Sequence, residues 1–131
     1  MDEKPSAQAS GHHQDIPPVL AQEIDSLETQ VHRFLREEID VAEFRRHRQI
    51  QGVYGQRQAM RYMIRVRIPH GDVTPEQLER LALIAEDFAG GRGHVTTRQD
   101  VQFHFVHPER ITEALRLLAE VGLHSREACG N

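Results

Sequence analysis

Residues 54–71 read YGQRQAMRYMIRVRIPHG, and residues 94–104 read HVTTRQDVQFH. In the first run, apolar and polar side chains alternate between Arg61 and Ile68. An alternation with a period of two is typical of a β-strand that buries one face. The side chains expected to point into the core are Tyr62, Ile64, Val66 and Ile68, and those expected on the other face are Arg61, Met63, Arg65 and Arg67. Pro69 and Gly71 then end the strand.

The residues after this strand predict a helix. Thr74 is a good N-cap, Pro75 suits the first helical position, and Gln77 completes a capping box. Gly90 and Gly91 end the helix, because glycine readily adopts the backbone conformation found at helix C-termini. The expected buried stripe comprises Leu78, Leu81, Ala82, Ala85 and Phe88.

A second strand region is expected over residues 94–106, where apolar residues again alternate with polar ones. The side chains expected to face the core are Val101, Phe103 and Phe105. Gln102 and His104 then fall on the opposite face. Pro108 opens a further amphipathic helix, which Gly122 closes. The apolar residues with helical spacing in it are Ile111, Ala114, Leu115, Leu118 and Val121.

Two helices are expected before the first strand. Helical spacing of apolar residues predicts an amphipathic helix over residues 19–38. These apolar residues are Leu20, Ile24, Leu27, Val31, Phe34 and Leu35. Asp40 and Glu43 form a pattern like a capping box, which predicts a second short helix through about Arg48. Residues 1–18 are polar and contain Pro, Ser and Gly, which predicts a disordered leader.

The predicted elements make an α+β fold. Its centre is a strand–helix–strand–helix unit with helices on one face of a small sheet, and an N-terminal amphipathic helix precedes it. Two strands alone are marginally stable. The unit therefore needs a further strand, a partner, or the rest of a longer protein. Where apolar surface would otherwise stay open, we expect the chain to self-associate.

Composition excludes several kinds of site. The 131 residues are 27% charged and 38% hydrophobic, which is typical of one small globular domain. Cys129 is the single cysteine, so an internal disulfide is excluded, as is a zinc or iron–sulfur site built from this chain's thiolates alone. We predict no metal site. No apolar run is long enough to span a bilayer and no signal pattern begins the chain, so we expect a cytoplasmic protein.

Positive charge is concentrated in one part of the chain. The interval from Phe44 to Gly71 contains seven arginines and no Asp or Glu, although the net charge of the chain is −4. Arg61, Arg65 and Arg67 on one strand face would repel one another unless an anion lay there. The rigid fork of donors on arginine matches carboxylates and oxyanions. The pattern therefore predicts a site for a specific anion.

An ordered set of residues along the chain also indicates a known family. It consists of residues 55–58 (GQRQ), residues 62–69 (YMIRVRIP), Gly71, Thr74, Gln77, Leu78, residues 96–99 (TTRQ), Gln102, Gly122, Leu123 and residues 128–131 (ACGN). This set resembles the N-terminal ferredoxin-like half-domain of the siroheme-containing nitrite and sulfite reductases. The resemblance covers about residues 44–131. Together with the leader and helices predicted above, it divides the chain into three parts: a leader over 1–18, N-terminal helices over 19–48, and the half-domain over 49–131.

The resemblance implies a function. In that family, siroheme is coupled to a 4Fe–4S cluster, and sulfite or nitrite is reduced by six electrons at the siroheme iron. The resemblance implies that Arg65 is a catalytic residue that faces the substrate anion. It implies that siroheme and its carboxylates are contacted by Thr97, Arg98, Gln99, Gln102 and His104, with Arg57 and Arg61 as further carboxylate partners. Several guanidiniums are needed to bury so many carboxylates.

The cluster cysteines and active-site lysines that this family carries further along are not among these residues. We therefore expect the chain to be the N-terminal part of a longer reductase, with neither cofactor bound to the chain alone and no turnover by it. The expected partners are the remaining reductase domains, an electron-donor protein or flavoprotein, and sulfite or nitrite. We expect Cys129 to be a bystander thiol rather than a cluster ligand.

Two other functions remain compatible with the residues. A free-standing ferredoxin-like module could bind a small anion or a protein partner, the latter through the helix over 19–38. RNA could bind the arginine-lined strand face, although the negative net charge and the few aromatic residues on that strand argue against it. The sequence does not distinguish sulfite from nitrite, and it does not specify the electron donor. We expect no partner that is a nucleic acid or a membrane.

Overall fold

The computed structural model describes residues 16–68, 72–91, 93–95 and 100–126. Most of the expected leader lies outside this range. The first helix, α1 (Pro18–Leu35), begins at the last residue assigned to that leader. Proline is well suited to this place, because the first N–H of a helix has no partner within the helix. The N-terminal helix is confirmed, and it ends at Leu35 rather than at residue 38.

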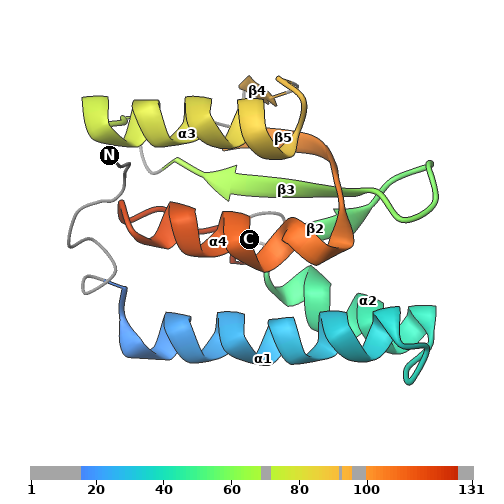
Figure 1. Ribbon diagram of the computed structural model, residues 1–131. Helices are drawn as coiled ribbons and strands as arrows, with labels where there is room; N and C mark the ends of the chain where they lie inside the picture. Colours follow the sequence, from blue (N-terminus) through green and yellow to red (C-terminus); the bar gives the residue numbers. More distant parts are fainter. Residues whose placement is uncertain (1–15, 69–71, 92, 96–99, 127–131) are drawn as a thin grey trace, which may run out of the picture.

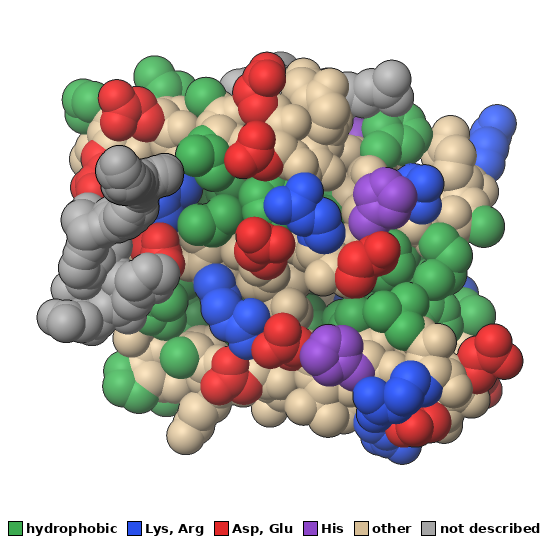
Figure 2. Space-filling view, in the orientation of Figure 1, with side chains coloured by type: hydrophobic (Ala, Val, Ile, Leu, Met, Phe, Trp, Pro, Cys, Tyr) green, Lys and Arg blue, Asp and Glu red, His purple; other side chains and the backbone are tan. Residues whose placement is uncertain are grey.

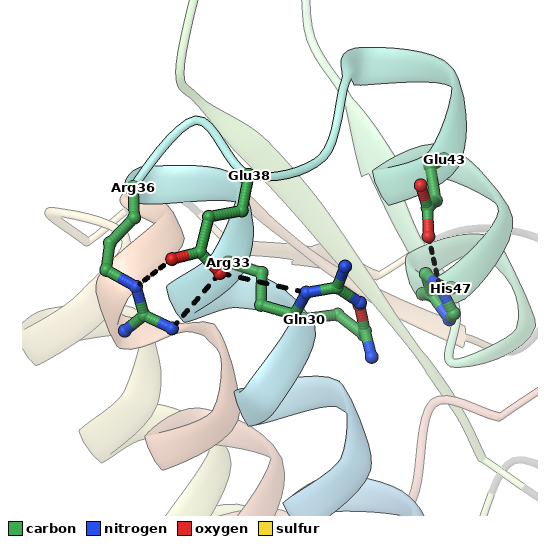
Figure 3. Close-up of polar contacts among 6 residues, drawn as sticks. All are labelled: Gln30, Arg33, Arg36, Glu38, Glu43 and His47. Carbon is green, nitrogen blue, oxygen red and sulfur yellow. Dashed lines mark hydrogen bonds and ion pairs between the residues drawn. The ribbon is translucent and has the colours of Figure 1, made fainter.

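The second helix, α2 (Val41–Ile50), starts as the sequence predicts. The side chain of Asp40 accepts a hydrogen bond from the backbone N–H of Glu43, with a length of 2.8 Å. The turn between the helices carries an ion pair of 2.9 Å from Arg36 to Glu38, with Arg33 on the other side of the same carboxylate (Figure 3). Beneath this turn the rings of Phe34 and Phe44 stack with 4.4 Å between their centroids, which joins α1 to α2.

In the described part of the chain, the sheet has four antiparallel strands in the order β2-β3-β5-β4. Their bounds are β2 (Val53–Gly55), β3 (Tyr62–Arg67), β4 (Gly93–Val95) and β5 (Asp100–Val106). The strand region expected over 94–106 is therefore a pair of strands, β4 and β5, and β2 is an additional strand that the sequence analysis did not predict. β2 and β4 supply the extra pairing that the predicted two-stranded unit required.

The alternation predicted for β3 is confirmed. Ile64 and Val66 are fully buried, while Met63 and Arg65 are partly exposed and Arg67 is exposed. Arg61 lies just before the strand rather than in it.

On β5 the expected alternation fails after His104. The register between β3 and β5 shifts between Tyr62 and Ile64, and Phe105 has a φ of 63°. This irregularity adds a residue to β5, so Val106 takes the buried position and Phe105 is only partly buried. The prediction that Phe105 faces the core is therefore wrong, because a bulge resets the period of two.

Two helices cover one face of the sheet. They are α3 (Pro75–Phe88) and α4 (Ile111–Ala119), which follows the short 3₁₀ helix η3 (Pro108–Arg110). Figure 1 shows α3 and α4 running alongside each other, with α1 outside α4 and α2 close to β2. The single core formed in this way includes Ile24, Phe44, Ile64, Ile84, Phe103 and Leu118.

The capping box of α3 is confirmed, whereas its predicted buried stripe is partly wrong. Thr74 and Gln77 exchange both hydrogen bonds of the box, each 3.0 Å long. Gln77 also donates to the carbonyl oxygen of Val121 at 2.9 Å, so this side of the helix start faces α4. Leu78, one position further round, is therefore 58% exposed. Ala82 is exposed too, and Ile84 is buried in its place.

The outer surface on the helix side is polar and of mixed charge. Arg116 of α4 contacts Asp25 and Glu28 of α1 at 2.8 and 2.7 Å, and Arg80 of α3 contacts Glu120 at 2.7 Å. Figure 2 shows acidic and basic side chains interspersed over this face. No helix in the described part of the chain is long and apolar enough to cross a membrane.

Candidate functional site

The candidate site lies on the sheet face opposite the helices. Because Ile64 and Phe103 point into the helical layer, their strand neighbours point to the other side. Arg65 of β3 and Gln102 of β5 are directly paired across the sheet. Two residues that the sequence analysis assigned to the site are thus adjacent on one open face, and His104 follows on the same strand.

Arg65 has a carboxylate partner within the sheet. Its Nε atom lies 3.6 Å from Oδ2 of Asp100, and both side chains are largely buried, at 13% and 6% exposure. The guanidinium also lies over the ring of Tyr54 on β2, 6.0 Å from the ring centroid. The expectation that the strand arginines require an external anion is therefore incomplete, because Asp100 already supplies one negative charge to this face.

A chain of hydrogen bonds crosses the same face. The Nε2 atom of His104 lies 3.2 Å from Oε1 of Gln102, and its Nδ1 atom lies 2.9 Å from Nε2 of Gln56. The Oε1 atom of Gln56 accepts a hydrogen bond of 2.6 Å from the backbone N–H of Phe105. This bond fixes which end of the amide faces His104, so the amide NH₂ donates to Nδ1. In this arrangement the imidazole accepts at Nδ1, and its Nε2 atom donates to Gln102.

The geometry of this chain depends on the irregularity in β5. Phe105 adopts a left-handed backbone conformation that bulky residues rarely occupy. This conformation brings its N–H to Gln56, which stands on the connection that follows β2. Backbone strain of this kind is often found where a structure positions functional groups.

The other arginines assigned to the site lie outside this cluster. Arg57 is exposed in the connection between β2 and β3. Arg61 is in the same connection, where its Nη1 atom donates to the carbonyl oxygen of Met60 at 2.9 Å. Thr97, Arg98 and Gln99 lie outside the described residues. The structure thus brings together Arg65, Gln102 and His104 from the predicted set.

Three residues of the site were missed in the sequence analysis: Tyr54, Gln56 and Asp100. Gln56 belongs to the segment GQRQ, so a signal was present without a role attached to it. Asp100 directly follows the segment TTRQ. Its pairing with Arg65 could not be read from either strand alone, because it depends on how β5 is aligned with β3.

Known proteins similar to this chain share its fold, and the similarity covers the part of the chain that contains the candidate site. The family model described as the nitrite/sulfite reductase ferredoxin-like half domain matches residues 54–121, more than half of the chain. The solved structure of the Mycobacterium tuberculosis NirA protein superposes with a TM-score of 0.64 at 26% sequence identity, over 82% of this chain and 25% of that one. The predicted resemblance and the α+β ferredoxin-like fold are thereby confirmed.

Curated relatives are similar in sequence and much longer. A sulfite reductase (NADPH) hemoprotein beta-component from Chromohalobacter salexigens is 33% identical over 108 residues, which are 82% of this chain and 18% of the relative. A sulfite reductase (ferredoxin) from Mycobacterium tuberculosis is 36% identical over 74 residues, which are 56% of this chain and 13% of the relative. The chain therefore spans less than a fifth of the length of these relatives.

Proposed function

The chain belongs to the nitrite and sulfite reductase family through its ferredoxin-like half domain, and on that premise we propose that its open sheet face serves a reductase that reduces sulfite by six electrons. In this proposal Arg65 faces the substrate oxyanion, and Gln102 and His104 contact siroheme. Sulfite is preferred over nitrite because the two curated relatives described above are named sulfite reductases. The half domain acts together with further reductase domains and an electron-donor protein.

The observation that carries the proposal is the position of Arg65. It is a guanidinium held on the open face by Asp100 and Tyr54, beside an ordered row of hydrogen-bonding side chains. A fixed cation of this kind holds an oxyanion and offsets the charge that develops as oxygen leaves. Because Asp100 and Tyr54 restrain the side chain, little reorganisation is needed when the substrate arrives.

The residues present fit one of the two cofactors that the family implies. Siroheme needs cations and hydrogen-bonding groups for its carboxylates, and the open face supplies both. When bound, siroheme supplies the iron at which the substrate is reduced. The 4Fe–4S cluster does not fit, because it requires several cysteine thiolates and this chain contains Cys129 alone. Within the described ranges, no three His, Cys, Asp or Glu side chains are grouped to hold a metal ion. We propose that other reductase domains ligate the cluster.

The experiment uses the longest reading frame that contains this chain, expressed in cells that also make siroheme. We expect the purified protein to show tetrapyrrole absorption and to reduce sulfite with a chemical electron donor. Arg65→Gln should keep the absorption and lower kcat/KM for sulfite about 100-fold, as the loss of one group that stabilises developing charge does elsewhere. Arg110→Gln is the matched control, since Arg110 stacks on Phe88, 3.9 Å from the ring centroid, away from the open face.

Two results would contradict the proposal. One is a protein that carries no tetrapyrrole although siroheme is made in the same cells. The other is an Arg65→Gln variant that turns over sulfite as fast as the Arg110→Gln control. Either result would favour a free-standing anion-binding or protein-binding module instead.

A further inference from the structure

A second basic site lies between α2 and the connection from β2 to β3, and it shares Tyr54 and Gln56 with the site on the open face. It is a cavity of about 540 Å³. Its apolar wall includes Phe34, Val41 and Met60, and its basic side chains are Arg45, Arg48 and Arg61. None of the described residues that line it is acidic. The volume falls within the range of roughly 300–1,000 Å³ that is usual for small-molecule sites.

Arg48 is the unusual member of this cavity. The sequence analysis placed it at the end of α2, where helix-terminal cations are normally solvated, yet it is only 6% exposed. Its Nη1 atom donates to the carbonyl oxygen of Val53 at 3.0 Å, and its guanidinium lies over the ring of Tyr62, 5.4 Å from the centroid. Its Nε atom is buried and has no hydrogen-bond partner among the residues that the structure describes. Burial, and then the neighbouring charge of Arg45, lower the pKa of Arg48, while Tyr62 acts in the opposite direction.

No carboxylate balances this buried charge in the described part of the chain. The acidic side chains nearest along the sequence have other partners. Glu38 pairs with Arg36, and Glu43 faces His47 at 3.9 Å (Figure 3). Asp40 caps the start of α2. A buried cation without a counter-ion is costly, so this arrangement is expected where a ligand supplies the missing negative charge.

The absence of a side chain at Gly55 leaves room for the guanidinium of Arg48. A Cβ atom at this position would lie 3.1 Å from the Nη2 atom of Arg48. That distance is tighter than ordinary van der Waals contact, so any side chain here would press on the guanidinium. The open side of the cavity next to Arg48 is thus kept free by the absence of a side chain.

We infer that this cavity binds a small organic carboxylate, with the carboxylate on Arg48 and Arg45 and the apolar body against Phe34 and Met60. An arginine fork suits a carboxylate better than a neutral group. The apolar wall and the volume favour an organic ligand over a bare inorganic oxyanion. The cavity shares Tyr54 and Gln56 with the open-face site, but its described lining residues include neither Arg65 nor His104, so substitution of Arg48 tests this inference separately from the proposed function.

The test titrates the isotope-labelled chain with benzoate and follows backbone amide shifts by NMR. Benzamide is the neutral control of the same shape, and sulfate is the inorganic control. We expect saturable shifts with benzoate in α2 and in the connection between β2 and β3, and none of comparable size with benzamide or sulfate. Arg48→Leu should weaken binding about tenfold or more, since it removes a charge-assisted contact.

Two further variants complete the design. Arg45→Gln changes an exposed residue, should leave the fold intact and should weaken benzoate binding several-fold, so the test does not depend on the folding of Arg48→Leu. Arg110→Gln removes one guanidinium outside the cavity and should not alter binding. The inference is overturned if benzoate produces no saturable shifts in these segments, if Arg48→Leu and Arg45→Gln bind it as the unmodified chain does, or if sulfate or benzamide binds equally well.

Discussion

The Nε atom of Arg65 lies 3.6 Å from Oδ2 of Asp100 across the pairing of β3 with β5. The two residues are not direct partners in the strand register, where Arg65 faces Gln102 and Asp100 faces Arg67. The ion pair is therefore diagonal. It uses a carboxylate from one strand to hold the arginine of the next strand on the open face.

Breaking this ion pair should destabilise the fold. We expect Asp100→Asn to lower the free energy of unfolding by about 1–3 kcal/mol, because Arg65 keeps its charge in a largely buried position after this carboxylate is gone. Urea unfolding at neutral pH measures the change. Asp72→Asn, at an exposed position, is the control and should change the free energy little. Equal unfolding midpoints for the two variants would contradict the prediction.

The tautomer of His104 can be observed directly. Since the amide of Gln56 is oriented by the N–H of Phe105, we expect the imidazole to carry its proton on Nε2 at neutral pH. Imidazole nitrogen shifts from NMR distinguish the two tautomers. Gln56→Leu removes the donor to Nδ1 and should leave a mixture of tautomers. A proton on Nδ1 in the unmodified chain would show that the hydrogen-bond chain runs differently.

His124 should make stability depend on pH. Although the residue as a whole is exposed, partial desolvation of its side chain is the main cause that lowers its pKa, and the charges of Arg126 and Arg67 act in the same direction, against Glu23. The folded state therefore binds a proton less readily than the unfolded state, whose histidine titrates near pH 6.5. Stability from this residue is fully present above that pH and falls as the pH drops toward the folded pKa. Urea unfolding at about pH 7.5 and about pH 5.5 should show a smaller loss for His124→Gln than for the unmodified chain. An identical pH dependence in both would be the contrary result.

The capping box at the start of α3 should contribute measurably to the stability of the fold. Thr74→Ala removes the acceptor for the N–H of Gln77 and should cost about 1 kcal/mol of unfolding free energy. Thr29→Ala is the matched control. It changes an exposed threonine within α1, where alanine has the higher helix propensity, so stability should hold or rise slightly. Thermal unfolding of the two variants would decide, and a Thr74→Ala variant as stable as Thr29→Ala would exclude the predicted contribution.

Substitutions at two glycines should distinguish the cost of backbone strain from the cost of steric overlap. Gly52 and Gly90 both have positive φ angles, of 74° and 58°. A Cβ atom at Gly90 would meet no atom of the described segments within 4 Å, so Gly90→Ala should cost only about 1–2 kcal/mol for the left-handed conformation. A Cβ atom at Gly52 would overlap the carbonyl oxygen of Ser125. Gly52→Ala should therefore be clearly more destabilising in urea unfolding, and equal losses would argue against this packing of residue 125 on the start of β2.

Features that depend on neighbouring residues in the chain were predicted well. The alternation along β3, the N-cap at Asp40 and the capping box at Thr74 are all confirmed, because each is decided by side chains only a few positions apart. Features that depend on packing were predicted less well. Leu78 is exposed because Gln77 turns toward Val121, in the turn after α4, and the spacing of apolar residues in α3 does not encode this contact.

The amino-acid sequence by itself determined the order of most elements, the buried face of β3 and the concentration of arginines between Phe44 and Gly71. Only the tertiary structure decided what those arginines contact. Arg65 lies against Asp100, whereas Arg48 is buried beside Tyr62 and has no carboxylate partner among the described residues. The physical reason is that such contacts join segments far apart in the chain, and their geometry follows from strand register and from the bulge in β5. Local side-chain patterns encode neither of these.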